Sequence, residues 1–211
     1  MEKAISYTSR GCITLLLLLA IVTGAAAQSA DISLLRSINV HRNHAYEGTM
    51  ISFTNSVYPV SAAIPLTELI AGYATHDKQT IINGWQTVAG LGLNTVLTFG
   101  LKYAVDRKRP YATYADIQPY QHDKDPSFPS GHSSFSFYSA TSLSICYPRW
   151  YIIVPSYLWA GTVGYSRMYL GMHYPSDVLG GAIVGSASAW LAYKGNKWLQ
   201  SRKHKQTGID Y

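Results

Sequence analysis

Helix-length apolar segments separated by polar turns are the feature that most constrains how this chain folds. Consecutive helices joined by short turns run antiparallel and pack into a bundle. Turn-like residues such as His76-Asp77-Lys78 and Tyr147-Pro148-Arg149 separate the segments. Five segments have the length of a helix: Thr49–Ala74, Thr80–Val105, Ser133–Cys146, Trp150–Tyr165 and Val178–Tyr193. We therefore expect an all-α fold, an antiparallel helical bundle of about five to six helices.

Residues 1–27 have the pattern of a secretory signal peptide. Two positive charges precede a short apolar core, Cys12–Val22, and Ala25-Ala26-Ala27 forms a small-residue cleavage site. The core is short for a membrane span, which needs about 20 residues, so an uncleaved anchor is the weaker alternative. After cleavage Cys146 would be the only thiol, and no internal disulfide could form.

The remaining chain divides into three parts. Residues 28–48 are polar, and their apolar residues recur at helical spacing: Ile32, Leu35 and Ile38. This pattern predicts an amphipathic helix that docks on the bundle or lies on a membrane surface. Residues 49–193 hold the apolar segments and form one helical domain, and residues 194–211 form a basic tail.

Composition leaves two settings open for the bundle. Apolar residues make up 47% of the chain and charged residues 13%, which favours a membrane protein. The mean hydropathy of +0.01 includes the very apolar signal, however, so the mature chain is slightly hydrophilic. Polar residues such as Glu68 and Asn94 also interrupt the candidate spans. A multipass membrane protein and a soluble periplasmic bundle both fit these observations.

Ser166–Asp177 contains the residue types of a catalytic site. Arg167 can hold an oxyanion, His173 can act as a nucleophile or base, and Asp177 can fix one imidazole tautomer. Pro175 suits the first turn of a helix and keeps the preceding residue extended. We expect His173 just ahead of this helix and Asp177 in its first turn. The alternative is an ordinary turn histidine beside an aspartate that complements the helix dipole.

Two upstream motifs indicate anion binding. Lys102 and Arg109 stand two helical turns apart, so two long side chains on one helix face can converge on a single anion. Ser130 is a good N-cap for the apolar run that follows, and the free amides around Gly131 form an anion seat beside His132. Each motif alone is more often a solvated helix end or a simple cap. Their occurrence in this order indicates one site.

The three motifs together resemble the tripartite signature of the type 2 phosphatidic acid phosphatase (PAP2) and vanadium haloperoxidase superfamily. They read Lys102-x6-Arg109-Pro110, Pro129-Ser130-Gly131-His132 and Ser166-Arg167-x5-His173-x3-Asp177. All three match without a substitution across residues 102–177, and the neighbouring apolar segments resemble the family's helical bundle. Five antiparallel helices with an outer N-terminus would bring all three motifs to one end, so we expect the active site there.

The resemblance implies a phosphatase that forms a phosphohistidine and needs no metal or other cofactor. His173 would be the nucleophile, Asp177 would orient it, and His132 would protonate the leaving oxygen and then activate water. The residues that would bind the phosphate are Lys102, Arg109, Ser130, Gly131 and Arg167.

The long irregular stretch Asp106–Phe128 is the expected substrate-selecting rim. Its tyrosines, such as Tyr111 and Tyr120, would contact a headgroup or pack at an interface. His122, Asp123 and Asp125 have the atoms for a metal site but lack regular ligand spacing, so we predict none.

The leading interpretation is a lipid phosphatase in the envelope of a Gram-negative-type bacterium. It would be a multipass inner-membrane protein with a periplasmic active site, acting on phosphate monoesters or pyrophosphates of lipids. The alternatives are a soluble, nonspecific periplasmic acid phosphatase and, less favoured, a vanadium haloperoxidase. The net charge of +6 lies partly in the signal and the tail, and no nucleic-acid-binding motif occurs, so nucleic acid is not an expected partner.

Overall fold

The computed structural model describes residues 29–207, with side chains placed for residues 29–202. The signal peptide predicted for residues 1–27 lies outside this range. Within it the chain forms helices and no strand, which confirms the all-α prediction. After a first helix over residues 29–39, the elements are η1 (His44–Tyr46), α2 (Glu47–Asn55), α3 (Val57–Thr75), α4 (Lys78–Val105), α5 (Pro110–Thr113), α6 (Gly131–Cys146), α7 (Trp150–Tyr169) and α8 (Pro175–Thr207).

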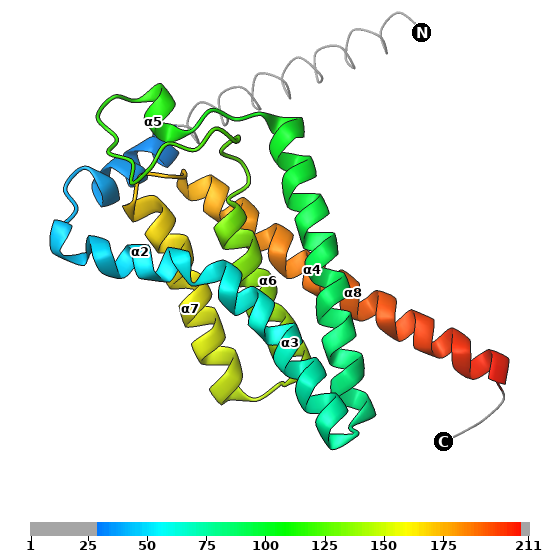
Figure 1. Ribbon diagram of the computed structural model, residues 1–211. Coiled ribbons are helices and arrows are strands. Elements are labelled where there is room, and N and C mark those ends of the chain that lie inside the picture. The colour runs from blue at the N-terminus through cyan, green and yellow to red at the C-terminus, as the bar shows by residue number, and fades with distance from the viewer. Residues whose placement is uncertain (1–28, 208–211) are drawn as a thin grey trace, which may run out of the picture.

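The long helices α3, α4, α6, α7 and α8 form an antiparallel bundle, as expected (Figure 1). Helix α6 lies at its centre and contacts each of the other four. The first helix, α5 and the irregular segments around them gather at one end of the bundle, called here the loop end (Figure 1). Helix α8 begins at this end, and its C-terminal part extends sideways away from the other helices (Figure 1).

Local signals in the sequence set the helix boundaries. Asp77 caps α4 by accepting a hydrogen bond from the Gln79 amide, and Pro175 occupies the first turn of α8. The predicted apolar segment Thr49–Ala74 is divided at Ser56 into α2 and α3. Helix α8 continues past Tyr193, where the basic tail was expected to begin, to Thr207.

Small polar residues fill much of the bundle interior. Hydroxyl groups on neighbouring helices bond to one another, as Thr98 does with Ser134 at 2.8 Å and Ser61 with Ser139 at 2.9 Å. Helices α6 and α8 approach closely at Gly185, which has no side chain. A Cβ atom added there would lie 2.1 Å from the Ser134 carbonyl oxygen. Such hydroxyl pairs and glycine contacts are typical of helices that pack within a bilayer.

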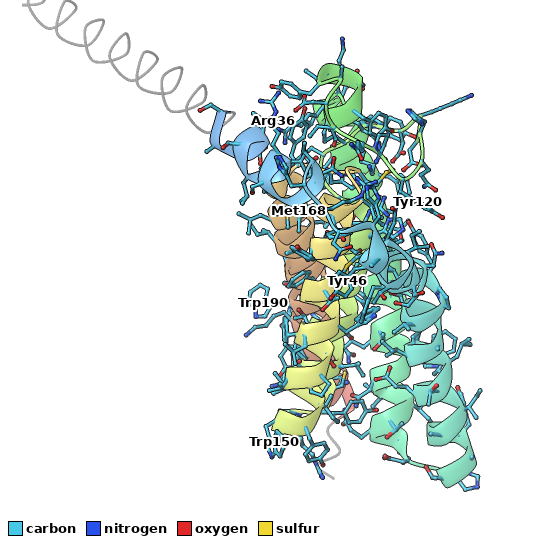
Figure 2. The ribbon with its side chains drawn as sticks, turned by 90° about the vertical axis from the view of Figure 1, so that its left-hand side faces the viewer. Arg36, Tyr46, Tyr120, Trp150, Met168 and Trp190 are labelled. Atoms are coloured by element: carbon cyan, nitrogen blue, oxygen red, sulfur yellow. The ribbon has the colours of Figure 1, made fainter. Side chains whose placement is uncertain are left out.

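Large apolar side chains cover much of the outer surface. Trp150 projects from α7 at the end opposite the loop end, and Trp190 projects from α8 near the middle of the bundle (Figure 2). Further exposed apolar residues lie on the four outer helices: Leu66 and Ile70 on α3, Val96 and Phe99 on α4, Val154 and Leu158 on α7, and Leu179 and Ile183 on α8. The bundle is therefore more polar inside and more apolar outside than is usual for a protein surrounded by water.

The helix over residues 29–39 docks on the loop end, as its apolar spacing predicted. Ile32 and Leu35 pack against Ile117 and Tyr174. Fully buried Asn39 donates hydrogen bonds to the carbonyl oxygens of Gln118 and Tyr169 at 3.0 and 2.9 Å.

Candidate active site

A cavity of about 410 Å³ at the loop end brings the three motifs together. Six of the eight predicted site residues line it: Lys102, Arg109, Gly131, His132, Arg167 and His173. Ser130 and Asp177 are fully buried behind this lining. Residues from three separate motifs therefore form one polar cavity.

Lys102 and Arg109 converge, but not by sharing a helix face as the spacing suggested. Helix α4 ends at Val105, because Asp106 takes the left-handed conformation with a φ of 47° and caps it. Arg109 has extended backbone and returns to the site from the following segment. A helix end and a loop thus supply the two cations.

Asp125 joins these two cations. Its carboxylate lies 2.7 Å from Lys102 Nζ and 2.7 Å from a terminal nitrogen of Arg109. The other terminal nitrogen of Arg109 lies 3.4 Å from His173 Nε2 and donates to the Met172 carbonyl oxygen. Burial raises the pKa of Asp125, but the hydrogen bond from Lys102 and the charge of Arg109 outweigh it and lower the pKa to about 2. Asp125 is therefore an anion that fixes the direction of both cations.

His173 and Asp177 form the predicted dyad. His173 lies in the segment before α8, with Nε2 toward the cavity and Nδ1 3.5 Å from Asp177 Oδ2. Burial and the charge of Arg109 lower the pKa of His173, and the hydrogen bond with Asp177 raises it. Burial has the largest effect, and the resulting pKa is about 3. The imidazole is therefore neutral near pH 7, and a proton on Nδ1 facing Asp177 leaves Nε2 with a free lone pair.

Arg167 is buried at the base of the cavity. Only 1% of its surface is exposed, and one terminal nitrogen donates to Thr54 Oγ1 at 2.6 Å. Its Nε has no hydrogen-bond partner in the structure. A buried guanidinium with an unused donor that lines a cavity is well placed to bind an anion.

The start of α6 provides Ser130, Gly131 and His132. The Ser130 hydroxyl caps the helix as predicted, since it accepts from the Ser133 amide, and it also accepts from the Ser133 hydroxyl at 3.0 Å. His132 faces the cavity with its ring edge against Tyr58, at 5.0 Å between ring centroids. Burial lowers the pKa of His132 to about 2, and the charge of Arg167 adds to this. Both imidazoles are thus neutral before an anion enters.

Four residues that support the site from outside the cavity lining were not predicted. Thr54 holds Arg167, Ser127 and Arg107 contact Asp177, and Asp31 contacts Arg107. Ser127 belongs to the segment just before Pro129, and Arg107 stands in the same basic run as Arg109, so both lay beside predicted motifs. Asp31 and Thr54 lie far from any motif and carry no sequence signal of their role.

The aromatic residues Tyr58, Phe99 and Phe135 form an apolar part of the cavity wall. Tyr58 and Phe99 are also exposed, on α3 and α4, so the cavity meets the apolar outer surface at this edge. Tyr111, from the predicted rim, bonds through its hydroxyl to the backbone of Asp123 and so supports this loop. Within the described residues no three histidine, cysteine or acidic side chains are grouped so that they could hold a metal ion.

A sequence profile of the PAP2 superfamily matches residues 83–201, which is more than half of the chain. The chain therefore belongs to the PAP2 superfamily, as the three motifs predicted. All eight predicted site residues lie within the matched range, whereas Asp31 and Thr54 precede it.

Several phosphatases resemble the chain in sequence. A lipid A 4'-phosphatase of Bacteroides thetaiotaomicron is 42% identical over 82 residues, which cover 39% of this chain and 36% of that protein. The undecaprenyl-diphosphatase BcrC of Bacillus subtilis is 28% identical over 154 residues, 73% of this chain and 77% of that protein. The chain thus matches only about a third of the first of these relatives.

Two solved structures share the fold. The Aquifex aeolicus LpxE structure superposes with a TM-score of 0.65 at 27% identity, covering 78% of this chain and 95% of that chain. The transmembrane PAP2-type phosphatidylglycerolphosphate phosphatase of Bacillus subtilis superposes with a TM-score of 0.67 at 26% identity, covering 88% of this chain and 95% of that chain. The bundle is therefore that of helical PAP2 phosphatases, and the prediction of a PAP2-type enzyme is confirmed.

Proposed function

We propose that this protein is a metal-independent phosphatase of envelope lipids that works through a phosphohistidine on His173. The observation that carries the proposal is the cavity itself. The neutral Nε2 of His173 faces the same space as three buried cations, Lys102, Arg109 and Arg167. A trigonal-bipyramidal phosphoryl group needs a nucleophile in line and positive charge on its equatorial oxygens.

In the first step His173 Nε2 attacks phosphorus, and the bond from phosphorus to the leaving oxygen breaks. Asp177 stabilises the positive charge that develops on the imidazole. Arg109 and Arg167 hold phosphoryl oxygens with Lys102, and Gly131 contributes the amide at the start of α6. His132 gives the leaving oxygen its proton.

In the second step His132 takes a proton from water, and the resulting hydroxide displaces His173 from phosphorus. His132 is neutral in the ligand-free cavity, so the proton of the first step must enter with the substrate. A phosphate monoester, whose second pKa is near 6, can bring that proton as its monoanion. The proton that His132 took from water leaves with the phosphate, so both imidazoles return to the neutral state.

Metal independence is supported by the ion pairs that the nearby carboxylates form with cations of the protein. Asp125 bridges Lys102 and Arg109, and Asp123 lies 3.2 Å from Arg109. Because both carboxylates are paired with cations of the protein, neither has free oxygens directed at a shared metal position. Three side-chain cations would instead supply the charge that a metal supplies in many phosphatases.

Membrane insertion is supported by the distribution of apolar residues. The hydroxyl-rich interior and apolar exterior of the bundle match a protein surrounded by lipid. Among the described residues, one stretch, Lys78–Thr113, which contains α4, is long and apolar enough to cross a membrane by length and composition alone. The predicted signal peptide and the basic end of α8 favour a periplasmic loop end, since positive residues prefer the inner side.

Lipid substrates are supported by the apolar edge of the cavity at Tyr58 and Phe99. A phosphate seated near His173 would leave its acyl or prenyl chain able to pass this edge into the bilayer. The named relatives act on lipid A and undecaprenyl diphosphate, and we propose a phosphorylated lipid of this kind as the substrate.

The test is phosphate release by the detergent-solubilised protein in EDTA, comparing a panel of phosphorylated lipids with p-nitrophenyl phosphate. We expect undiminished release in EDTA and a strong preference for one lipid. Loss of activity in EDTA that is restored by a metal would overturn metal independence. Equal or better turnover of the soluble ester would favour a nonspecific acid phosphatase.

A further inference from the structure

Asp177 is held by more than the histidine that it orients. Its Oδ2 accepts from the Ser127 hydroxyl at 2.5 Å and from the Tyr174 amide at 2.9 Å. Its Oδ1 lies 2.6 Å from a terminal nitrogen of Arg107. Because Asp177 is fully buried, these donors fix where its carboxylate lies and therefore how it faces His173.

Arg107 is itself fixed from two sides. Its second terminal nitrogen lies 2.7 Å from Asp31 Oδ2, and its guanidinium stacks on the Tyr174 ring at 3.9 Å from the centroid. The side chain is about a quarter exposed, so without Asp31 it could turn toward solvent. Asp31 also accepts from the amide and the hydroxyl of Ser176, the residue next to Asp177.

Asp31 comes from a part of the chain outside the family match. It lies in the helix over residues 29–39, whereas the PAP2 profile begins at residue 83. That helix is docked independently of Asp31, through buried Leu35 and through Asn39. Asp31 is therefore placed by its helix and in turn places Arg107.

We propose that Asp31 is a positioning residue for the catalytic dyad and acts through Arg107. The helix over residues 29–39 completes the active site from behind, on the side of Asp177 away from the cavity. The inference rests on the proposed phosphohistidine mechanism, in which Asp177 stabilises charge that forms on His173 only during reaction. Loss of Asp31 should therefore lower kcat and leave KM nearly unchanged, because the cations that bind phosphate are untouched.

The chain provides a matched control on the same helix. Arg36 pairs with Asp116 at 2.7 Å and also ties the helix over residues 29–39 to the segment between α4 and α6. This pair is exposed and does not touch the dyad. Arg36→Gln thus removes a docking contact of the same kind without removing a partner of Arg107.

The experiment measures kcat and KM for the wild type, Asp31→Asn, Arg107→Gln, the double variant and Arg36→Gln, in detergent with the preferred lipid substrate. We expect kcat to fall about tenfold in Asp31→Asn, the lower end of the loss found when a residue that orients a metal ligand is removed. It should fall further in Arg107→Gln, and the loss in the double variant should be well below the product of the two single losses. Arg36→Gln should stay near the wild type.

Two results would overturn the proposal. One is a fall in Asp31→Asn no larger than in Arg36→Gln, and the other is a double variant whose losses multiply, which would make Asp31 independent of Arg107. Thermal unfolding of each variant shows whether a low kcat comes from loss of the fold or from a misplaced dyad, because only loss of the fold lowers the unfolding temperature strongly. Failure of the proposed function itself would appear differently, as wild-type protein that releases no phosphate.

Discussion

The middle of the bundle and its loop end both bury polar groups, but of different kinds. In the middle, neutral hydroxyls pair between helices, as Thr87 does with Ser142. At the loop end, full charges are buried, with Lys102 3% exposed and Arg167 1% exposed. Neutral pairs hold helices together in an apolar surrounding, whereas a surplus of buried cations needs an anion. The first region builds the fold, and the second prepares a phosphate site.

If this division is right, His173→Ala should cause the largest loss of activity and little loss of stability. Removal of the nucleophile should lower kcat by at least about 10⁴-fold, the scale found when a nucleophile is deleted from a hydrolase. Phosphate release and thermal unfolding would be measured together. His41→Ala, at an exposed histidine, is the control. Near-normal rates in His173→Ala would exclude His173 as the nucleophile.

Asp177→Asn should have the next largest effect. An amide in place of the carboxylate cannot stabilise the charge on His173 and no longer requires a proton on Nδ1, so we expect kcat to fall roughly 10³-fold or more. Steady-state kinetics would check this. An unaffected variant would reduce Asp177 to a residue that stabilises the first turn of α8.

Substitutions in the middle should instead change stability. At Gly185 an added Cβ would meet the backbone of α6, while at Gly161 on α7 nothing lies within 4 Å. Alanine favours a helix over glycine by about 1 kcal/mol, so Gly161→Ala should be neutral or stabilising. Gly185→Ala should lower stability by about 1–3 kcal/mol through overpacking. Thermal unfolding in one detergent would compare the pair, and equal shifts would contradict the packing observed.

The smallest expected effect is on the pH profile. Burial lowers the pKa of His173 to about 3, so the nucleophile stays unprotonated when the pH falls from 7 to 5. We expect kcat/KM to hold or rise over this range, as more substrate becomes monoanionic. An imidazole with an ordinary pKa of 6.5 would be about 25-fold less available at pH 5 than at pH 7. Because the gain in monoanionic substrate offsets part of that loss, any fall in kcat/KM over this range would show that His173 is not held in the neutral state.

The sequence predicted half of the cavity lining because the motif residues act at close range to the phosphoryl group. It did not predict how Lys102 and Arg109 meet, since the left-handed residue Asp106 ends α4 between them. Asp31 and Thr54 were missed because their roles depend on contacts with residues far away in the chain.

Hydropathy also did not decide between a membrane-spanning bundle and a soluble one, for a physical reason. Serines such as Ser134 and Ser139 lie inside the bundle, where they lower the mean hydropathy without facing lipid. The apolar residues that would face lipid, such as Leu158 and Ile183, can be told apart from core residues only once the helices are placed.

The most direct test of the central claim is to trap the phosphoryl group on the enzyme. In His132→Ala the second step lacks its base, so a single turnover of p-nitrophenyl phosphate, whose leaving group needs no proton from His132, should leave a phosphoryl group on the protein. Rapid quenching in alkaline denaturant, which preserves phosphohistidine, followed by peptide mass spectrometry would locate it. We expect the added mass of one phosphoryl group on His173, and none in the His132→Ala/His173→Ala double variant. A phosphoryl group on another residue, or wild-type turnover with no trapped group under any quench, would contradict the mechanism.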